Sequence, residues 1–548
     1  MKIKSFIFFS YFILLPFLVI SQTWPKIYIN PGTHTSGKVA YESYDNGIIL
    51  LAENLGQYGL RTSGWLIKTD INGNVLWDRV IGRQEQYLSL TNNMEATSDS
   101  GVVIAMSTRF FEQDPFGFYN DPVFIKLNKC GQLDWCTLIS LLGTGNSGTD
   151  VVQTNDGFIG LYYNLNVPNN DIGVVKMNLN GQIQWLFTYD SDTIVDNIPC
   201  DILALDDGST IVTGFGYYDN GQSTYVSLKP VKLHIAPDGG VINWQVMHYD
   251  NDSLRGVDYE TIKDNRGNLF SAGSTITTQT YPYNYDKKTL RKQKVNGSNL
   301  EYYIQDESKS INGYLCWMVD STIAITGASE IFENNWWRYP SDVSIIDTFG
   351  NVINNRILLD DYWGSVYRVS TTHDNKILAT GSADAENPYG PPGNTFLFKL
   401  TSTLEDDVYD PTPRVYDYAC PGGVAPHDTI GMEECDIVVS AAHLATLPDI
   451  AVMEVYPNPV NDVFQVRLPE FIAIRNNNKG LNTALYQSNY QQQSTLQVFD
   501  LSGRFISEQK LTQGQLVAQF DASRWVPGMY LLRLVYKDKT VGSAKVVR

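Results

Sequence analysis

Clustered carboxylates offer the first candidate chemistry in this chain of 548 residues. Asp190, Asp192 and Asp196 lie close together in one polar stretch, and calcium prefers oxygen ligands of this kind. Their spacing lacks the complete pattern of an EF-hand loop, so solvated acidic loops are the competing interpretation. We expect no obligatory cofactor, and calcium is the one ion that this stretch could hold.

Aromatic residues form the second candidate site, because they recur in loop-like stretches between predicted strands. The residues that we single out for ligand binding are Tyr217, Tyr283, Trp336, Trp337, Tyr339 and Trp363. Aromatic rings beside carboxylates can stack on sugar rings or form a patch that binds protein. The alternative is that these rings pack between neighbouring structural units. The stretch Trp336-Trp337-Arg338-Tyr339 is the strongest candidate for an exposed group.

The sequence contains no complete catalytic motif. Gly143–Gly148 has GxGxxG spacing, but a dinucleotide site needs a helix at the last glycine, and a hairpin is predicted there. The zinc-protease, serine-hydrolase and phosphate-loop motifs do not occur. We therefore expect no catalytic residues. The alternative is a polysaccharide hydrolase or lyase, because paired carboxylates for such chemistry are defined by separation in space.

The elements that must position these residues repeat along the chain. A β-rich run with lysine, a glycine turn and a strand that often contains tryptophan recur together, as in Trp65–Trp77. A second turn, of Asn-Gly or Asp-Gly type, precedes each copy, and such turns between apolar runs predict β-hairpins. We expect the turn glycines of the main signature to be Gly73, Gly131, Gly181, Gly240, Gly297 and Gly350.

Two hairpins in each unit predict an all-β protein with four-stranded blades. About seven units fit between residues 22 and 402, and this region resembles repeat β-propeller proteins. The alternatives are an open solenoid or a row of sandwiches, which need shorter or longer units. The last unit is incomplete, so we expect a strand near Ile27–Ile29 to close the ring. The aromatic and acidic loops would then share one face of the propeller.

The N-terminus has the features of a secretory signal peptide over residues 1–21. Lys2 and Lys4 precede an apolar run, Ser5 to Ile20, and the small residue Ser21 suits cleavage. A membrane anchor is the alternative, but Pro16 and the short run argue against it. No later segment reaches the length of a transmembrane span.

The charge of the chain is strongly negative and uneven. Its net charge is −19, while residues 451–548 hold 11 basic and 7 acidic residues, which leaves −23 for the rest. Such a charge repels nucleic acid, and we find no basic run of the kind that binds it. We expect neutral or cationic partners and no nucleic acid.

Four of the six cysteines are disulfide candidates in two local pairs. Cys130 and Cys136 flank a predicted hairpin turn, and Cys420 and Cys435 bracket a loop-like stretch. Export would permit such bridges. We expect the other two cysteines to be small buried residues.

A different β-rich module follows a predicted linker at residues 403–450. Its marked residues, in three blocks over residues 451–548, are Tyr456, Pro457, Asn458, Pro459, Gly503, Gly528 and Tyr530. The module resembles the C-terminal sorting domain of the type IX secretion system of Bacteroidetes. The resemblance implies a small β-sandwich, recognised by the translocon and its sorting protease, and a protein that is secreted or attached to the outer cell surface. We expect the insertion Phe471–Ser494 to be an extended loop.

These observations favour a secreted or surface-attached propeller that binds a glycan or a protein and has no catalytic activity. The polysaccharide-degrading enzyme, with carboxylates at the propeller channel, is the alternative. A purely structural or adhesive surface protein is the third possibility.

Overall fold

The computed structural model describes most of the chain between residues 24 and 548. The described ranges are 24–31, 33–55, 62–82, 89–108, 121–140, 146–165, 170–189, 194–218, 227–246, 255–276, 286–309, 313–328, 331–333, 336–338, 340–358, 363–384, 393–432, 435–439, 451–469, 471–475, 482–486, 491, 493–501, 504–512, 515–537 and 539–548. The predicted signal peptide and Gly143–Gly145 lie outside them.

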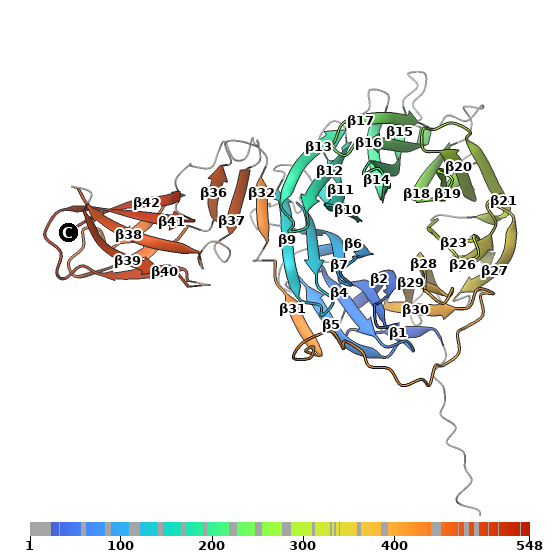
Figure 1. Ribbon diagram of the computed structural model, residues 1–548, viewed down its shortest axis with the longest axis horizontal. Helices are drawn as coiled ribbons and strands as arrows, with labels where there is room; N and C mark the ends of the chain where they lie inside the picture. Colours follow the sequence, from blue (N-terminus) through green and yellow to red (C-terminus); the bar gives the residue numbers. More distant parts are fainter. Residues whose placement is uncertain are drawn as a thin grey trace, which may run out of the picture.

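The described strands build a β-propeller of seven four-stranded antiparallel blades around a central axis (Figure 1). The strands of blades 1 to 4 are β2 (His34–Glu42), β3 (Ile48–Leu55), β4 (Thr62–Thr69), β5 (Val75–Ile81); β6 (Ser89–Ala96), β7 (Val102–Thr108), β8 (Asp121–Leu127), β9 (Leu133–Ser140); β10 (Asn146–Thr154), β11 (Gly157–Leu165), β12 (Asn170–Asn178), β13 (Ile183–Tyr189); β14 (Ile194–Ala204), β15 (Thr210–Tyr218), β16 (Ser227–Ile235) and β17 (Val241–Val246).

Blades 5 to 7 complete the ring. Their strands are β18 (Arg255–Lys263), β19 (Asn268–Ile276), β20 (Asp286–Lys294), β21 (Glu301–Lys309); β22 (Leu315–Trp317), β23 (Ile323–Ala328), β26 (Ser341–Ile346), β27 (Val352–Leu358); β28 (Trp363–Thr371), β29 (Ile377–Asp384), β30 (Asn394–Leu400) and β1 (Lys26–Tyr28). A small hairpin of β24 (Ile331–Glu333) and β25 (Trp336–Arg338) interrupts blade 6. The prediction of about seven blades is confirmed.

The N-terminal strand closes the ring, as the sequence predicted. β1 pairs antiparallel with β30, with Lys26 opposite Leu397 and Tyr28 opposite Thr395. The Tyr28 hydroxyl also donates a hydrogen bond to the Gly73 carbonyl of blade 1 at 3.0 Å. Blade 7 therefore combines both ends of the propeller region.

The lysine of the repeat signature has a structural role in blades 1 to 3. It lies on the third strand and pairs with the aspartate of the first turn of the same blade. The Nζ to carboxylate distances are 2.5 Å for Lys68 and Asp45, 2.9 Å for Lys126 and Asp99, and 2.5 Å for Lys176 and Asp156. This pair ties the two turns of a blade together on one face of the ring.

The segment predicted as a linker carries two strands that extend the propeller. β31 (His427–Ile430) pairs parallel with β5, and β32 (Asp436–Val439) pairs parallel with β9. The outer edges of blades 1 and 2 are thereby covered, which protects two edge strands from unwanted pairing.

Two long-range disulfides hold this segment, and the expected local pairing is wrong. Cys130 is bonded to Cys420 and Cys136 to Cys435, with sequence separations of 290 and 299 residues. The local pairs fail because the tail runs across the outside of blades 1 and 2, where each of its cysteines meets one from blade 2. Cys200 and Cys316 are free and half-buried.

The C-terminal module is a two-sheet β-sandwich around a core that includes Phe464, Leu532 and Leu534. Its strands are β33 (Ala451–Val452), β34 (Glu454–Tyr456), β35 (Val463–Arg467), β38 (Ser494–Asp500), β39 (Phe505–Lys510), β40 (Val517–Asp521), β41 (Met529–Tyr536) and β42 (Lys539–Val547). No helix among the described residues is long and apolar enough to cross a membrane.

The insertion Phe471–Ser494 was predicted as an extended loop, and this is wrong for its described part. β36 (Phe471–Arg475) and β37 (Asn482–Tyr486) form a hairpin. β37 also pairs antiparallel with β32, so the hairpin extends the sheet of blade 2 toward the sandwich (Figure 1). The partner strand is about fifty residues away in the sequence, which is why the insertion has no local strand signal.

Candidate functional site

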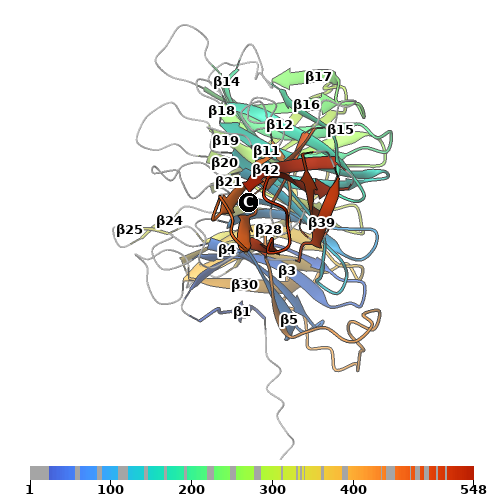
Figure 2. The same ribbon diagram turned by 90° about the vertical axis from the view of Figure 1, so that its left-hand side faces the viewer.

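Four of the six predicted aromatic residues lie in described strands, and two lie outside the described residues. Trp336 and Trp337 are in β25, and the β24–β25 hairpin projects from one face of the ring (Figure 2). Trp363 is the first residue of β28. Tyr283 and Tyr339 lie outside the described residues. Ligand binding by this group stays a prediction.

One aromatic residue and one acidic residue of the two predicted sites lie in the described part of blade 4. Tyr217 and Asp196 are directly opposite each other on β15 and β14, near the end of blade 4. Tyr162, an aromatic residue of β11, is fully buried. Asp190 and Asp192 lie outside the described residues, so the calcium prediction is untested. Within the described ranges, no group of three or more His, Cys, Asp or Glu is arranged to hold a metal ion.

Equivalent positions around the central channel carry five polar or charged residues and one valine. The first strand of each blade lies nearest the axis (Figure 1), and six of these strands contain a β-bulge. The residues just after the bulges are Val39, Asn93, Asp150, Asp201, Glu260 and Arg368. Bulges turn side chains away from the normal alternation, and here they bring charged groups inward.

Three carboxylates of this ring bind the backbone of the next blade. Asp150 accepts a hydrogen bond from the Ile202 N–H at 3.1 Å. Asp201 accepts one from the Thr261 N–H at 2.9 Å, and Glu260 one from the Leu315 N–H at 2.6 Å. The same contact thus recurs between blades 3, 4, 5 and 6, which identifies these acids as links between blades.

The electrostatics of the ring reflect an excess of acid. Burial raises the pKa values of Asp150, Asp201 and Glu260, and for Asp201 the neighbouring carboxylates raise the pKa further. Arg368 lies 3.5 Å from Glu260. Burial opposes the charged form of Arg368, but Glu260 and Asp150 outweigh it and raise its pKa. The guanidinium therefore stays charged and offsets part of the negative charge.

Glu95 lies at the turn end of the same channel. Burial, with a contribution from Asp150, raises the pKa of Glu95 to about 7. The Tyr41 hydroxyl donates a hydrogen bond to Glu95 at 3.4 Å. A carboxyl group with a pKa near neutrality can both give and accept a proton, which is the property required of a general acid or base.

A second candidate site lies at blade 4, where the lysine and tryptophan of the repeat signature are replaced. In blades 1 to 3, the signature lysine lies opposite a tryptophan on the outer strand: Lys68 opposite Trp77, Lys126 opposite Trp135, and Lys176 opposite Trp185. These indoles fill the seam with the next blade. Trp135 donates to the Leu179 carbonyl at 3.0 Å and Trp185 to the Pro237 carbonyl at 3.1 Å.

In blade 4 the same pair is His234 and Asn243. The predicted turn glycine, Gly240, is wrong by one residue, because Gly239 has the positive φ of 89°. Trp244 therefore lies one residue later than the other tryptophans, and a shift of one residue reverses the face of the strand. Its indole N–H is buried and has no hydrogen-bond partner among the described residues.

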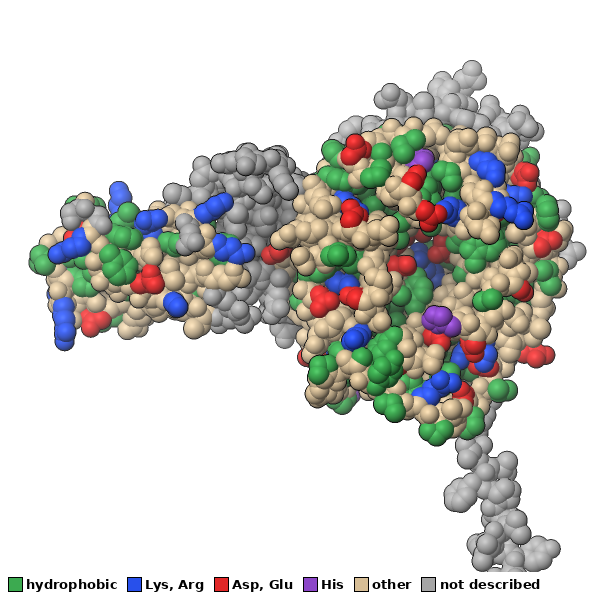
Figure 3. All heavy atoms as spheres, in the orientation of Figure 1, with side chains coloured by type: hydrophobic (Ala, Val, Ile, Leu, Met, Phe, Trp, Pro, Cys, Tyr) green, Lys and Arg blue, Asp and Glu red, His purple; other side chains and the backbone are tan. Residues whose placement is uncertain are grey.

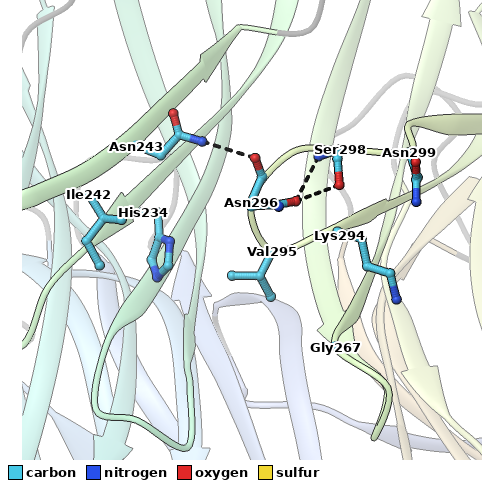
Figure 4. Close-up of a pocket in the computed structure, with 9 residues that line it drawn as sticks. All are labelled: His234, Ile242, Asn243, Gly267, Lys294, Val295, Asn296, Ser298 and Asn299. Carbon is cyan, nitrogen blue, oxygen red and sulfur yellow. Dashed lines mark hydrogen bonds between the residues drawn. The ribbon is translucent and has the colours of Figure 1, made fainter.

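This substitution leaves a groove of about 790 Å³ between blades 4 and 5 (Figure 4). His234 and Ile242 lie on one side of it, and Lys294, Asn296 and Ser298 on the other. His234 is buried and its Nε2 lies 2.9 Å from the Ser209 hydroxyl. Burial lowers the pKa of His234, so the ring is neutral near pH 7. None of the nine lining residues carries a carboxylate.

Sequence reasoning missed this groove, although a signal was present. An alignment of the repeat units by their turns would have shown that blade 4 has His234 where blades 1 to 3 have lysine, and Asn243 where they have tryptophan. It also missed the basic run Lys287–Lys294, with five basic residues in eight. Lys288 and Arg291 of this run are buried against Asp342 and Asp258, whereas Lys294 lines the groove. Figure 3 shows basic side chains gathered over β20 and β21 on this face.

The marked residues of the C-terminal module hold its last strand. The Asn458 side chain donates to the Lys545 carbonyl at 3.0 Å and accepts from the Val547 N–H at 2.9 Å. Gly528 exchanges two backbone hydrogen bonds with Arg548, each 2.9 Å long. The Tyr530 hydroxyl donates to the Val526 carbonyl at 2.6 Å. Tyr456, Pro457 and Pro459 are exposed, and Gly503 lies outside the described residues.

Comparison with solved structures finds several proteins at low similarity. A protein of unknown function from Dyadobacter fermentans is 9% identical, with a TM-score of 0.41, over 69% of this chain and 97% of its own. The β-propeller domain of the Trilobed protease from Pyrococcus furiosus is 8% identical, with a TM-score of 0.35, over 70% and 90%. Polysaccharide lyase Uly1 is 11% identical, with a TM-score of 0.43, over 68% and 90%. None of these likenesses bears on what the chain binds.

Comparison by sequence identifies the C-terminal module. No curated protein matches the chain. The family model "Secretion system C-terminal sorting domain" matches residues 454–548. This confirms the resemblance drawn from the Tyr456, Gly528 and Tyr530 blocks. The chain is therefore a β-propeller protein with a C-terminal sorting domain that directs its export, through the type IX secretion machinery, to the cell surface or the medium.

Proposed function

We propose that this protein is an exported binding module that holds an extracellular glycan or protein without transforming it. The observation that carries the proposal is the use of the channel acids. Asp150, Asp201 and Glu260 each accept a backbone N–H of the following blade, and a carboxylate engaged in this way is poorly placed to act on a ligand. Ligand contact then falls to the loops on the faces of the ring, because loops held by a rigid scaffold commonly carry binding residues.

The charge of the protein narrows the ligand further. Most of the propeller region is acidic, which favours neutral or cationic partners over its general surface. The groove between blades 4 and 5 is an exception, because it has a lysine and no carboxylate. A binding module with a lysine-containing groove on an otherwise acidic surface selects ligands by charge as well as by shape.

The experiment uses the exported protein, purified at full length without its signal peptide. Affinity electrophoresis in gels that contain different polysaccharides measures binding, and reducing-end release in the same mixtures measures cleavage. Slower migration with at least one polysaccharide, without new reducing ends, is the expected result. Release of product would contradict the proposal.

An acid–base enzyme is the second candidate, and Glu95 is the observation that favours it. Its pKa of about 7 and the hydrogen bond from Tyr41 would suit proton transfer to a ligand in the channel. If cleavage is found, Glu95→Gln and Tyr41→Phe should each lower the rate by about a hundredfold. Glu405→Gln, at an exposed glutamate far from this pair, is the matched control.

A further inference from the structure

The groove between blades 4 and 5 lies where the tryptophan of blades 1 to 3 is replaced. In blades 2 and 3 the indole N–H of the outer-strand tryptophan is hydrogen-bonded to the next blade. Blade 4 has Asn243 in that position, and its amide keeps a contact with the next blade by donating to the Asn296 carbonyl at 3.3 Å. Asn354 of blade 6 makes the equivalent contact with the Thr403 carbonyl at 2.6 Å. The displaced Trp244 buries its N–H without a partner among the described residues. An unpaired buried donor costs about 1–3 kcal/mol. Local rules that are broken at a cost usually mark functional sites.

The side chains around the groove offer hydrogen bonds of both kinds. Asn296, Ser298 and Asn299 are exposed at the turn of blade 5. Asn243 donates to the Asn296 carbonyl at 3.3 Å, which leaves its amide oxygen available toward the seam. Amides and hydroxyls that can donate and accept match a ligand that is rich in hydroxyl groups. The apolar surfaces of Ile242 and Val295 can cover the C–H face of a sugar ring.

The charge at the groove points to an acidic ligand. Lys294 donates to the Arg266 carbonyl at 3.3 Å and interacts electrostatically with the nearby Asp264 carboxylate, without forming a salt bridge to it. His234 is neutral at this site because burial lowers its pKa. The lining of the groove therefore carries one lysine and no carboxylate, on a protein whose net charge is −19.

We infer that this groove binds an acidic oligosaccharide, with Lys294 pairing with a carboxylate of the sugar and the amides of Asn243, Asn296 and Asn299 binding its hydroxyl groups. This inference rests on the proposed binding function and names the ligand class and the site. It differs from the expectation of neutral or cationic partners for this one face of the ring.

Two variants test the site by different means. Asn243→Trp restores the residue that fills the seam in blades 1 to 3, and it should abolish binding by occupying the groove. Lys294→Gln removes the charge without repacking, and it should weaken binding about tenfold, the effect of one charge-assisted hydrogen bond. Lys263→Gln is the matched control, because Lys263 belongs to the same blade but pairs with Asp206 outside the groove.

The probes are tri-galacturonic acid, neutral galactotriose and tri-glutamate, titrated into the full-length protein by calorimetry. We expect saturable binding of tri-galacturonic acid, at least tenfold weaker binding of galactotriose, and none of tri-glutamate. Equal affinity for the neutral sugar, preference for the peptide, or absence of binding to all three would overturn the inference. Unfolding midpoints of the variants verify that they are folded.

The outcomes separate this inference from the proposed function. If the wild-type protein binds polysaccharides but neither Asn243→Trp nor Lys294→Gln changes the affinity, the groove is not the site and the binding function stands. If the wild-type protein cleaves the trisaccharide, the proposed function falls, while loss of cleavage in both variants would still locate the ligand at the groove.

Discussion

At the scale of single residues, the buried acids of the channel have two different roles, and acids in different positions have different roles. Asp150, Asp201 and Glu260 connect neighbouring blades, while Glu95 contacts a tyrosine near the turn end. Both groups are acids in a region where burial disfavours charge. The three connecting acids should therefore contribute to stability mainly through their hydrogen bonds. Glu95 should affect stability mainly through its protonation.

The connecting acids should tolerate an isosteric amide and not an apolar side chain. Asp201→Asn keeps an oxygen that can accept from the Thr261 N–H, so we expect a change within about 0.5 kcal/mol. Asp201→Leu leaves that N–H unpaired and should lower the free energy of unfolding by about 1–3 kcal/mol. Urea denaturation of the two variants measures the difference. Equal losses would show that the hydrogen bond is not what matters.

Glu95 should make the protein less stable as the pH rises. Its pKa is about 7 in the folded protein and about 4.5 ordinarily, so the folded state retains a proton that the unfolded state loses. The free energy of unfolding should then fall between pH 4.5 and 7 and level off above. The other buried acids, Asp150, Asp201 and Glu260, act in the same direction.

The variant Glu95→Gln removes this titration. At pH 8 it should be more stable than the wild type by roughly 2 kcal/mol, allowing for the partial exposure of Glu95. Thermal unfolding across the pH range provides the measurement, with Glu405→Gln as the exposed control. An unchanged slope in Glu95→Gln would mean that Glu95 does not hold its proton in the folded state.

At the scale of elements, the tail strands β31 and β32 bind the outer edges of blades 1 and 2 and are locked by disulfides. The chain between the bonded cysteines is 290 and 299 residues long. Closing loops of this length restricts the unfolded chain strongly, although measured gains vary. The tail and the closing strand β1 together secure the ring near its seam.

Peptide mapping without reduction should find Cys130 joined to Cys420 and Cys136 to Cys435. The double variant Cys420→Ser with Cys435→Ser should lose about 3–5 kcal/mol of stability. The control is Cys200→Ser with Cys316→Ser, at the free cysteines, which should leave the effect of reductant unchanged. Recovery of Cys130–Cys136 and Cys420–Cys435 peptides would contradict the arrangement.

The elements that the sequence predicted well depend on local signals. Turns such as Gly131 and Gly181, with φ of 68° and 74°, are visible because glycine tolerates this conformation. The pairing of Cys136 with Cys435 and the addition of β37 to β32 depend on which segments meet in space. No local pattern encodes such contacts. The groove was missed for a different reason, since it follows from the absence of a repeated residue.

At the scale of the whole molecule, β32, β37 and β36 extend the sheet of blade 2 and lie between the propeller and the sorting domain (Figure 1). The Asn458 side chain and the Gly528 backbone hold the end of β42. The marked motifs therefore stabilise the C-terminal strand of the domain. Loss of these contacts should disturb the unit that the export machinery recognises.

Export should fail when this unit is removed. Deletion of residues 454–548 should retain the protein in the periplasm, and Asn458→Ala should lower the exported fraction several-fold because the last strand loses two hydrogen bonds. Immunoblots of the periplasm, cell surface and medium measure the distribution. The exposed variant Arg467→Gln, in the same domain, serves as control. Normal export of the deletion would contradict the role of the domain.

The central claim is that the exported propeller binds its ligand and leaves it intact. The most direct measurement is mass spectrometry of an oligosaccharide that has been bound by the full-length protein and recovered after denaturation. We expect stoichiometric recovery of the ligand at its original mass. Recovery of shorter or unsaturated fragments would contradict it, and would transfer the function to the acids of the channel.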